Sequence, residues 1–520
     1  MPDEDSDDKP LRSRRAFLRW ATATGLWAVA PATVSAVASA ADRDRPDPVP
    51  ASARGDPADG VSIRHPLDLP GVRHRLDRYR RTDDPTVLYR RALADHLRNH
   101  PSQTTFSVVV TTMGERSRTP SRGSNDRTFQ GWRPTDDEVA TLAEFGDVGF
   151  VASVNGTTVS LTGVSRADLR DVAALEFVLA VAWDPPLHQE GCGAGTGESV
   201  NALRSKQYHS FDALDGSYSI PQDVSLGVIG TGYDADDTPY TKPYAQEMGI
   251  DERLAKDFTT DGDWSTDTYT GDDCPAHGAG VADTVAYMLG DDAGHDNLFV
   301  PLKIWSAENE HEVATVADHL RAAIEYATLH GIDVVNVSSG MRYTDELTDY
   351  CTAQFCASLD AYARSGYVAT STAGNAGDEA GVQQPGGSWL TIGTGGVDRS
   401  GCEDGDADYH RHGHSCYASE YDYTTCDWCG TYDESGSAPT VYGAYDTTTD
   451  AATVISGTSF AAPVAAAAAL VMQANDLYSY ETARSIFEDM RQHTVCPSQA
   501  SRTGGVVDAY EAFHRTKPEE

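Results

Sequence analysis

Gly457-Thr-Ser-Phe-Ala-Ala-Pro463 is the most informative segment of this 520-residue chain, because it places a serine at the start of a small-residue helix. The alanine-rich stretch 464–472 follows it directly and predicts a closely packed helix. The backbone N–H groups and the positive end of such a helix would face any negative charge that forms beside the Ser459 hydroxyl. A lone serine here would be an ordinary N-cap. A catalytic role therefore requires partners elsewhere in the sequence.

Three upstream motifs offer such partners. His277-Gly-Ala-Gly280 puts an imidazole at the start of a predicted helix, and Thr372-Ala-Gly-Asn375-Ala-Gly377 puts an amide on a loop after a buried strand, where it can donate to an oxyanion. Asn336-Val-Ser-Ser-Gly340 ends another strand, where Ser338, Ser339 and Gly340 can pair with an extended peptide. Taken singly, each motif would be read as a structural histidine, a turn asparagine or a polar loop.

Around these motifs, apolar strands alternate with helical segments, which predicts a mostly parallel sheet covered on both faces. The expected strands are 226–229, 298–304, 332–337 and 367–371, and the expected helices are 278–289, 313–330 and 359–364. We therefore expect a three-layer α/β domain over residues 206–515.

A smaller unit is expected over residues 105–185. Its predicted order is β-α-β-β-α-β, from a first strand at 106–112 through a hairpin turn at Asn155-Gly156 to a last strand at 177–183. This order describes a small ferredoxin-like α+β sheet. We interpret residues 41–104 as a linker with one helix near 87–98, and residues 186–205 as a flexible, cleavable junction.

The first 40 residues have the pattern of an export signal. Arg14-Arg15 followed by Phe17-Leu18 fits the twin-arginine type, and an Ala/Val/Thr-rich segment leads to a small-residue site near Ala40. An uncleaved membrane anchor is the alternative, although the apolar segment is short. We expect cleavage, an extracellular product and no stable membrane span after the signal is removed.

The charge balance restricts the partners. The chain has 40 Lys+Arg against 79 Asp+Glu, a formal net charge of −39, and the acidic residues are spread along its length. So negative a surface argues against nucleic acid as a partner. Because only six of the basic residues are lysines, the composition resembles that of proteins from salt-loving organisms, where high ionic strength screens self-repulsion.

Together, the order and spacing of the motifs resemble those of subtilisin-like serine proteases, over about residues 226–513. The resemblance implies that Ser459 is the nucleophile, that His277 is the general base and then acid, and that Asn375 stabilises the oxyanion with the Ser459 N–H. Ser338 to Gly340 would line the substrate strand. It also implies a polypeptide substrate, no cofactor for catalysis, and an inhibitory propeptide at 105–185 that binds the enzyme domain.

One triad member is missing from the pattern. The family strand ends in Asp-Thr/Ser-Gly, whereas this chain has Gly230-Thr231-Gly232. Glycine cannot orient the imidazole or stabilise the imidazolium. Three hypotheses remain: a substitute carboxylate from Asp234, Asp272 or Asp273, a water in the gap that leaves a slow protease, or an inactive homologue that binds peptides.

Nine cysteines add a second question. Residues 402–429 form a predicted insertion that holds four of them with three histidines. Cys402, Cys416, Cys426 and Cys429 can form two disulfides, or a zinc site with His410, His412 and His414. No calcium ligand set can be matched. Whether a structural metal binds is therefore left open.

Overall fold

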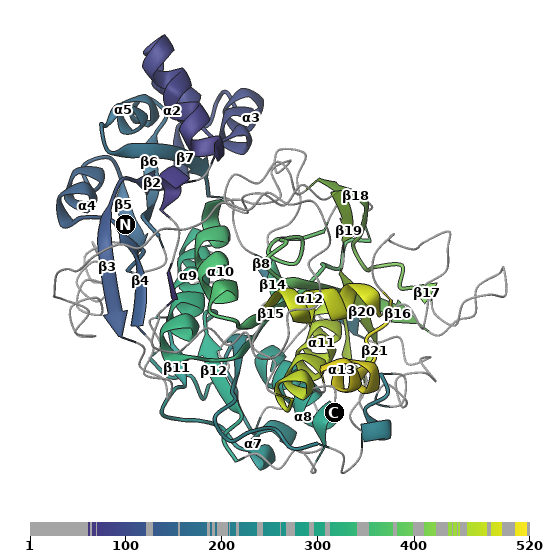
Figure 1. Cartoon of the computed structure of the whole chain (residues 1–520). Coiled ribbons are helices and arrows are strands. Elements are labelled where there is room, and N and C mark those ends of the chain that lie inside the picture. The colour runs from purple at the N-terminus through teal and green to yellow at the C-terminus, as the bar shows by residue number, and fades with distance from the viewer. Residues whose placement is uncertain are drawn as a thin grey trace, which may run out of the picture.

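The computed structural model (Figure 1) describes most of the chain after residue 60. The described residues are 61–62, 65–68, 70–120, 128–153, 156–184, 188–189, 193–194, 206, 209–214, 218–236, 243–259, 262–266, 276–290, 296–306, 313–340, 353–377, 382–398, 410–422, 435–438, 440–444, 446–447, 455–475, 480–490 and 505–516. The predicted signal at 1–40 lies outside them. In these ranges no helix is long and apolar enough to cross a membrane.

The large domain is built on an eight-stranded sheet, as far as the described residues trace it. Its neighbours pair in parallel, except that β17 runs antiparallel to β16. In spatial order the strands are β11 (Lys256–Asp257), β12 (Phe299–Lys303), β10 (Leu226–Gly230), β13 (Val334–Val337), β15 (Val368–Thr372), β16 (Ile392–Asp398) and β17 (His410–Arg411), with β20 (Val441–Ala444) also on β16. The central strands β10, β13 and β15 are fully buried, as is typical of a parallel sheet with helices on both faces.

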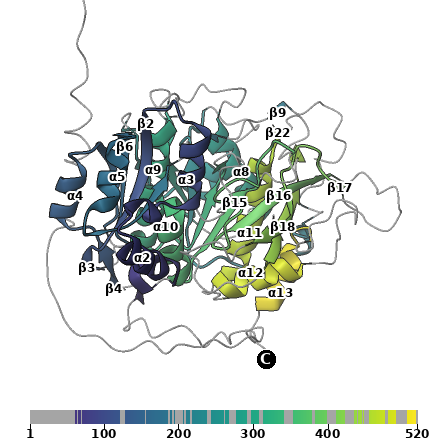
Figure 2. The ribbon, with the colours of Figure 1, turned by 90° about the horizontal axis from the view of Figure 1, so that it is seen from above.

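Helices cover both faces of this sheet. On one face lie α8 (His277–Leu289) and α11 (Thr458–Gln473), and on the other lie α9 (Val313–His330) and α10 (Ala353–Arg364) (Figures 1 and 2). Every residue of α11 is buried, because its alanines let the helix approach the sheet closely. The expected mostly parallel, three-layer α/β domain is thus present.

The smaller unit at 105–184 has a four-stranded antiparallel sheet in the order β5-β6-β2-β7. Its elements are β2 (Thr105–Thr112), α4 (Asp136–Leu142), β5 (Asp147–Val151), β6 (Thr158–Ser165), α5 (Asp168–Ala174) and β7 (Val178–Trp183). This is the predicted β-α-β-β-α-β order. Thr135 caps α4 through a capping box with Glu138. Helices α9 and α10 lie between this unit and the large sheet (Figure 2).

Two features of the N-terminal half differ from the expectation. Residues 61–104 are more ordered than a linker with one helix, because α2 (Pro70–Thr82), the 3₁₀ turn η3 (Pro85–Leu88) and α3 (Arg91–Asn99) fold onto the small unit. Leu93 is buried in its core. A hairpin of β3 (Glu115–Pro120) and β4 (Thr128–Arg133) is also inserted after β2, and β1 (Val61–Ser62) joins it. Its arginine-rich sequence hid its strand character.

The remaining elements are short or lie at the C-terminal end. They are η2 (Pro66–Asp68), β8 (His188–Gln189), β9 (Gly193–Ala194), η5 (Asp212–Leu214), α7 (Tyr244–Met248), β14 (Ser339–Gly340), β18 (Ala418–Asp422), β19 (Ser435–Ala438), β21 (Asp446–Thr447), β22 (Ile455–Ser456), α12 (Tyr480–Asp489) and α13 (Ala509–Thr516). Helix α13 packs against α11.

Candidate active site

Ser459 lies in the first turn of α11, after a glycine that no other residue could replace without strain. Gly457 has φ +142°, and a Cβ atom there would lie 3.4 Å from Asn375 Nδ2. The Ser459 side chain is fully buried. Its Oγ donates a 3.4 Å hydrogen bond to the Ser338 carbonyl, and Ser338 Oγ donates a 2.8 Å bond to the Ser459 carbonyl. The predicted nucleophile and the first residue of the predicted substrate strand are therefore in contact.

His277 is the first residue of α8 and is held by the turn that follows β10. The Gly278 N–H donates to Thr231 Oγ1 at 2.9 Å, and Gly278 packs so tightly on the Gly232 carbonyl that no side chain would fit. Only 1% of the imidazole is exposed, and this burial lowers its pKa to about 4. The ring is consequently neutral at physiological pH, the form that a general base needs.

The structure brings His277 and Ser459 onto adjacent helices without joining them by a hydrogen bond. The imidazole centroid lies 5.6 Å from the ring of Phe460, the residue after Ser459, and α8 packs on α11. Within the described part of the chain, neither ring nitrogen of His277 has a hydrogen-bond partner. Proton transfer would therefore require Ser459 Oγ to rotate away from the Ser338 carbonyl.

Asn375 is oriented by Thr458, the neighbour of the predicted nucleophile. Its Oδ1 accepts hydrogen bonds from the Thr458 N–H and hydroxyl, both at 2.8 Å. The Thr458 hydroxyl also contacts Thr372 Oγ1 and accepts from the Gly374 N–H. The Nδ2 end of the amide lies on the side of Gly457. An amide N–H is the type of donor that stabilises an oxyanion. No signal in the sequence singled out Thr458 for this role.

Gly230, where the family resemblance predicts the triad carboxylate, is the last residue of β10. Among the described atoms, a Cβ at Gly230 would have only Gly278 Cα within 4 Å, at 3.9 Å. The first carbon of a larger side chain would therefore fit at this position without a clash. Asp234 does not replace the carboxylate: it bonds the Asp236 N–H instead, and the His277 nitrogens lack partners. Asp272 and Asp273 lie outside the described residues.

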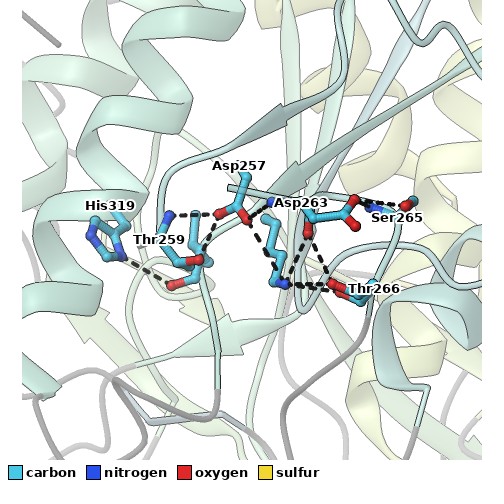
Figure 3. Close-up of polar contacts among 8 residues, drawn as sticks. Asp257, Thr259, Asp263, Ser265, Thr266 and His319 are labelled. Atoms are coloured by element: carbon cyan, nitrogen blue, oxygen red, sulfur yellow. Dashed lines mark hydrogen bonds and ion pairs between the residues drawn. The ribbon is translucent and has the colours of Figure 1, made fainter. Parts of the chain in front are cut away.

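A buried lysine supports the same turn, and the sequence analysis did not select it. Lys303 is the strand neighbour of Gly230 and is fully buried. Its Nζ donates to the carbonyls of Asp263 (3.0 Å) and Thr266 (2.9 Å) and lies 3.8 Å from Asp257 Oδ2 (Figure 3). A single lysine at the end of the apolar segment 299–302 was the available signal.

The loop around Lys303 is closed by short hydrogen bonds of its own (Figure 3). Asp257 accepts from the N–H and hydroxyl of Thr259, and Asp263 accepts from those of Ser265. The Trp264 carbonyl then accepts from the Tyr233 N–H, beside Gly232. An ammonium group surrounded by oxygens thus fixes the loop against the turn that positions His277.

The chain itself runs along the predicted substrate strand. Strand β14 pairs in antiparallel fashion with β8, with Gly340 opposite His188 and Ser339 opposite Gln189. Four residues further along the chain, β9 pairs with β22, directly before Gly457. The segment between β8 and β9 therefore connects two strands that flank the motif of Ser459. Ser339 and Gly340 thus pair with a strand of this chain, and their role in binding a substrate stays a prediction.

The small unit contacts α9 through a buried ionic cluster. The guanidinium of Arg321 bonds Asp184, at 2.5 Å, and Asp318. Burial raises the pKa of both carboxyl groups, to about 6 for Asp318. Beside this cluster, Glu325 accepts from the N–H (2.9 Å) and hydroxyl (2.7 Å) of Ser153. The sequence could not reveal this cluster, because the residues bonded across the interface are 137 or 172 positions apart in the chain.

The predicted cysteine- and histidine-rich insertion is only partly described. Cys416 is buried, and its Sγ accepts a 3.2 Å hydrogen bond from the Ala376 N–H, next to Asn375. Cys402, Cys426 and Cys429 lie outside the described residues. The described ranges contain no cluster of three or more His, Cys, Asp or Glu that could hold a metal, so the choice between disulfides and zinc stays open.

Comparison with known proteins bears on the family and the fold. Residues 221–505 match the model of the subtilase family, peptidase S8. Fervidolysin from Fervidobacterium pennivorans, described as a keratinolytic enzyme related to subtilisin, aligns at 16% identity with a TM-score of 0.50 over 79% of this chain and 61% of its own. A lanthipeptide protease aligns at 16% identity with a TM-score of 0.44 over 63% of this chain and 99% of its own. No curated protein sequence matches.

Proposed function

The chain belongs to the subtilase family, and we propose that it is a serine endopeptidase made as a self-inhibited precursor. The observation that carries this proposal is the arrangement at Ser459. A buried serine at a helix N-terminus lies beside the oriented amide of Asn375 and next to a strand that already pairs with an extended peptide.

The reaction would be acyl transfer. Ser459 Oγ forms a bond to the peptide carbonyl carbon while its proton passes to His277, and the oxyanion accepts from Asn375 Nδ2 and the Ser459 N–H. His277 then returns the proton to the departing amine, and water releases the acyl group by the same route. Each step uses groups that this chain supplies.

Gly230 limits the expected rate. In subtilisin, a member of the same family, loss of the triad aspartate alone lowers turnover by about 3 × 10⁴-fold. From a typical ~10 s⁻¹, this leaves on the order of 3 × 10⁻⁴ s⁻¹, or roughly one turnover an hour. Such an enzyme digests protein slowly, yet it can cut its own chain once.

We propose that this cut falls between Gln189 and Gly193. The pairing of β8 with β14 and of β9 with β22 supports this site, because it flanks Ser459 from both sides. The unit at 105–184 would then be the inhibitory propeptide. The twin-arginine pattern and the net charge of −39 further suggest export as a folded protein into a salt-rich medium.

The test is reaction of the full chain, expressed and kept in high salt, with a fluorophosphonate probe. We expect mass spectrometry to find the probe on Ser459, and to find the chain cut between residues 189 and 193. Ser459→Ala should abolish both results, His277→Ala should strongly reduce them, and Ser365→Ala, a buried serine on the opposite face of the sheet, should change neither. An intact, unlabelled wild-type chain would contradict the proposal and favour an inactive peptide-binding homologue.

A further inference from the structure

The wall of the peptide cleft contains a buried glutamine that the reaction does not use. Gln383 is 2% exposed, and its side chain fills the space between β14 and the loop of Asn375. A Cβ at Gly340 would lie 2.5 Å from Gln383 Oε1, and a Cβ at Gly374 would lie 2.6 Å from its Cγ. Both flanking residues are glycines that make room for this one side chain.

The backbone of Gln383 is fixed to the same loop. Its N–H donates to the Ala373 carbonyl at 2.9 Å, and its carbonyl accepts from the Gly387 N–H at 2.8 Å. Gly374 has φ +104°, where a larger residue would be strained, and its N–H bonds Thr458. These contacts fix the position of Gln383 relative to the loop of Asn375 and to the proposed peptide-binding strand β14.

One end of this amide is unsatisfied within the described part of the chain. Gln383 Oε1 is buried and accepts no hydrogen bond from any described residue. A buried carbonyl oxygen of this kind is costly unless a donor reaches it. Gly340 of β14 packs against this oxygen, so a peptide paired with β14 would bring a side chain close to Gln383.

We propose that Gln383 is a specificity-determining residue of the proposed peptidase, selecting an uncharged side chain with an N–H or O–H donor before the cut bond. Gln, Asn, Ser and Thr are such residues. Lysine and arginine also donate, but no salt bridge or hydrogen bond in the described residues brings a carboxylate to Gln383, so their charge would be buried without compensation. Apolar residues would leave Oε1 unpaired.

The test compares residue preferences, and it rests on the proposed function. A peptide library is digested by the self-processed wild type, and kcat/KM is measured for one peptide pair that differs only by Gln or Met before the cut. We expect Gln to be favoured by about 10–100-fold. Gln383→Met keeps the size of the side chain but loses the acceptor, so the preference for Gln over Met should vanish or reverse. Gln383→Glu adds a negative charge and should shift the preference towards Lys and Arg before the cut bond.

Gln473→Met is the matched control. Gln473 is another buried glutamine whose Oε1 accepts no hydrogen bond from the described residues, but it lies at the far end of α11. Its variant should therefore keep the wild-type preference. Equal preferences in the wild type, Gln383→Met and Gln383→Glu would overturn the specificity proposal while leaving the peptidase intact. A wild type that cuts no peptide and does not label at Ser459 would overturn the proposed function, and the role of Gln383 with it.

Discussion

Thr458 holds the carbonyl end of the Asn375 amide with two donors, its backbone N–H and its hydroxyl, each at 2.8 Å. These two bonds fix the carbonyl end of the amide, so that we expect its NH₂ end to face the substrate. Preorganised donors of this kind act without reorganisation during the reaction, which is why they lower the barrier. The residue beside the proposed nucleophile thus prepares the group that would stabilise the intermediate.

Asn375→Ala should lower kcat by about 10²–10³-fold with little change in KM, because the donor acts mainly in the transition state. Asn375→Asp keeps the acceptor for Thr458 but replaces the donor with an oxygen, so it should be at least as slow. Thr458→Val should lose less than either variant. Single-turnover cleavage of a peptide gives all three values. An Asn375→Asp variant as fast as the wild type would mean that Asn375 does not face the oxyanion.

Gly230→Asp should raise the rate of cleavage by several powers of ten, because a carboxylate there could accept from the imidazole and stabilise the imidazolium. It should also raise the pKa of His277, which burial now lowers to about 4. Since the base must be neutral, the acid limb of kcat/KM should move to higher pH.

Gly230→Asn is the control for this experiment, since it has the same size without the charge, and it should gain little. The pH–rate profiles of the three proteins distinguish the hypotheses. If Gly230→Asp brings neither a faster rate nor a shifted limb, the outcome would point to another carboxylate, such as Asp272 or Asp273, or to a site that does not react.

The parts of the molecule that sequence could predict are those set by local pattern. The alternation of apolar strands and helices identified the parallel sheet, and the ends of Val334–Val337 and Val368–Thr372 carried polar motifs to one edge of it. Motif order was enough to place Ser459, Asn375 and Ser338 together.

The parts that sequence missed depend on contacts between distant segments. In the sequence, Lys303 is only one of six lysines. Its role depends on the fold, which surrounds its ammonium group with carbonyls of a loop some 40 residues away. Gln383 carried no motif, and only the two glycines packed against it reveal its place. Strand β8 is two residues long, too short for any periodicity to show.

Lys303→Met should destabilise the protein by about 2–4 kcal/mol, because it leaves the carbonyls of Asp263 and Thr266 and the carboxylate of Asp257 without the buried ammonium. Activity should fall too, since this loop supports the turn before His277. Lys256→Met, on the neighbouring strand and only partly buried, should cost much less. Urea midpoints of both variants measure the difference. Equal costs would show that the Lys303 cluster does not stabilise the turn.

The ionic cluster between the small unit and α9 should make the docked state weaker as pH rises from about 4 to about 6. Asp318 has a raised pKa of about 6 because it is buried, with Asp184 adding repulsion and Arg321, Ser160 and the Phe150 N–H opposing the rise. Once undocked, its pKa returns towards the ordinary 3.8. A carboxyl group with a raised native pKa favours the native state most when both states are protonated, and that advantage is lost as pH passes through the native pKa.

The change can be isolated with urea midpoints of Ser459→Ala, which stays uncut, and of Ser459→Ala/Asp318→Asn, which cannot ionise at this position. At about 1.4 kcal/mol per pKa unit, the stability of the first protein relative to the second should fall by up to about 3 kcal/mol between pH 4 and pH 7. Most of the fall should occur below pH 6. A difference that stays constant, or that grows with pH, would show that Asp318 is ionised in the docked state and that Arg321 fully compensates its burial.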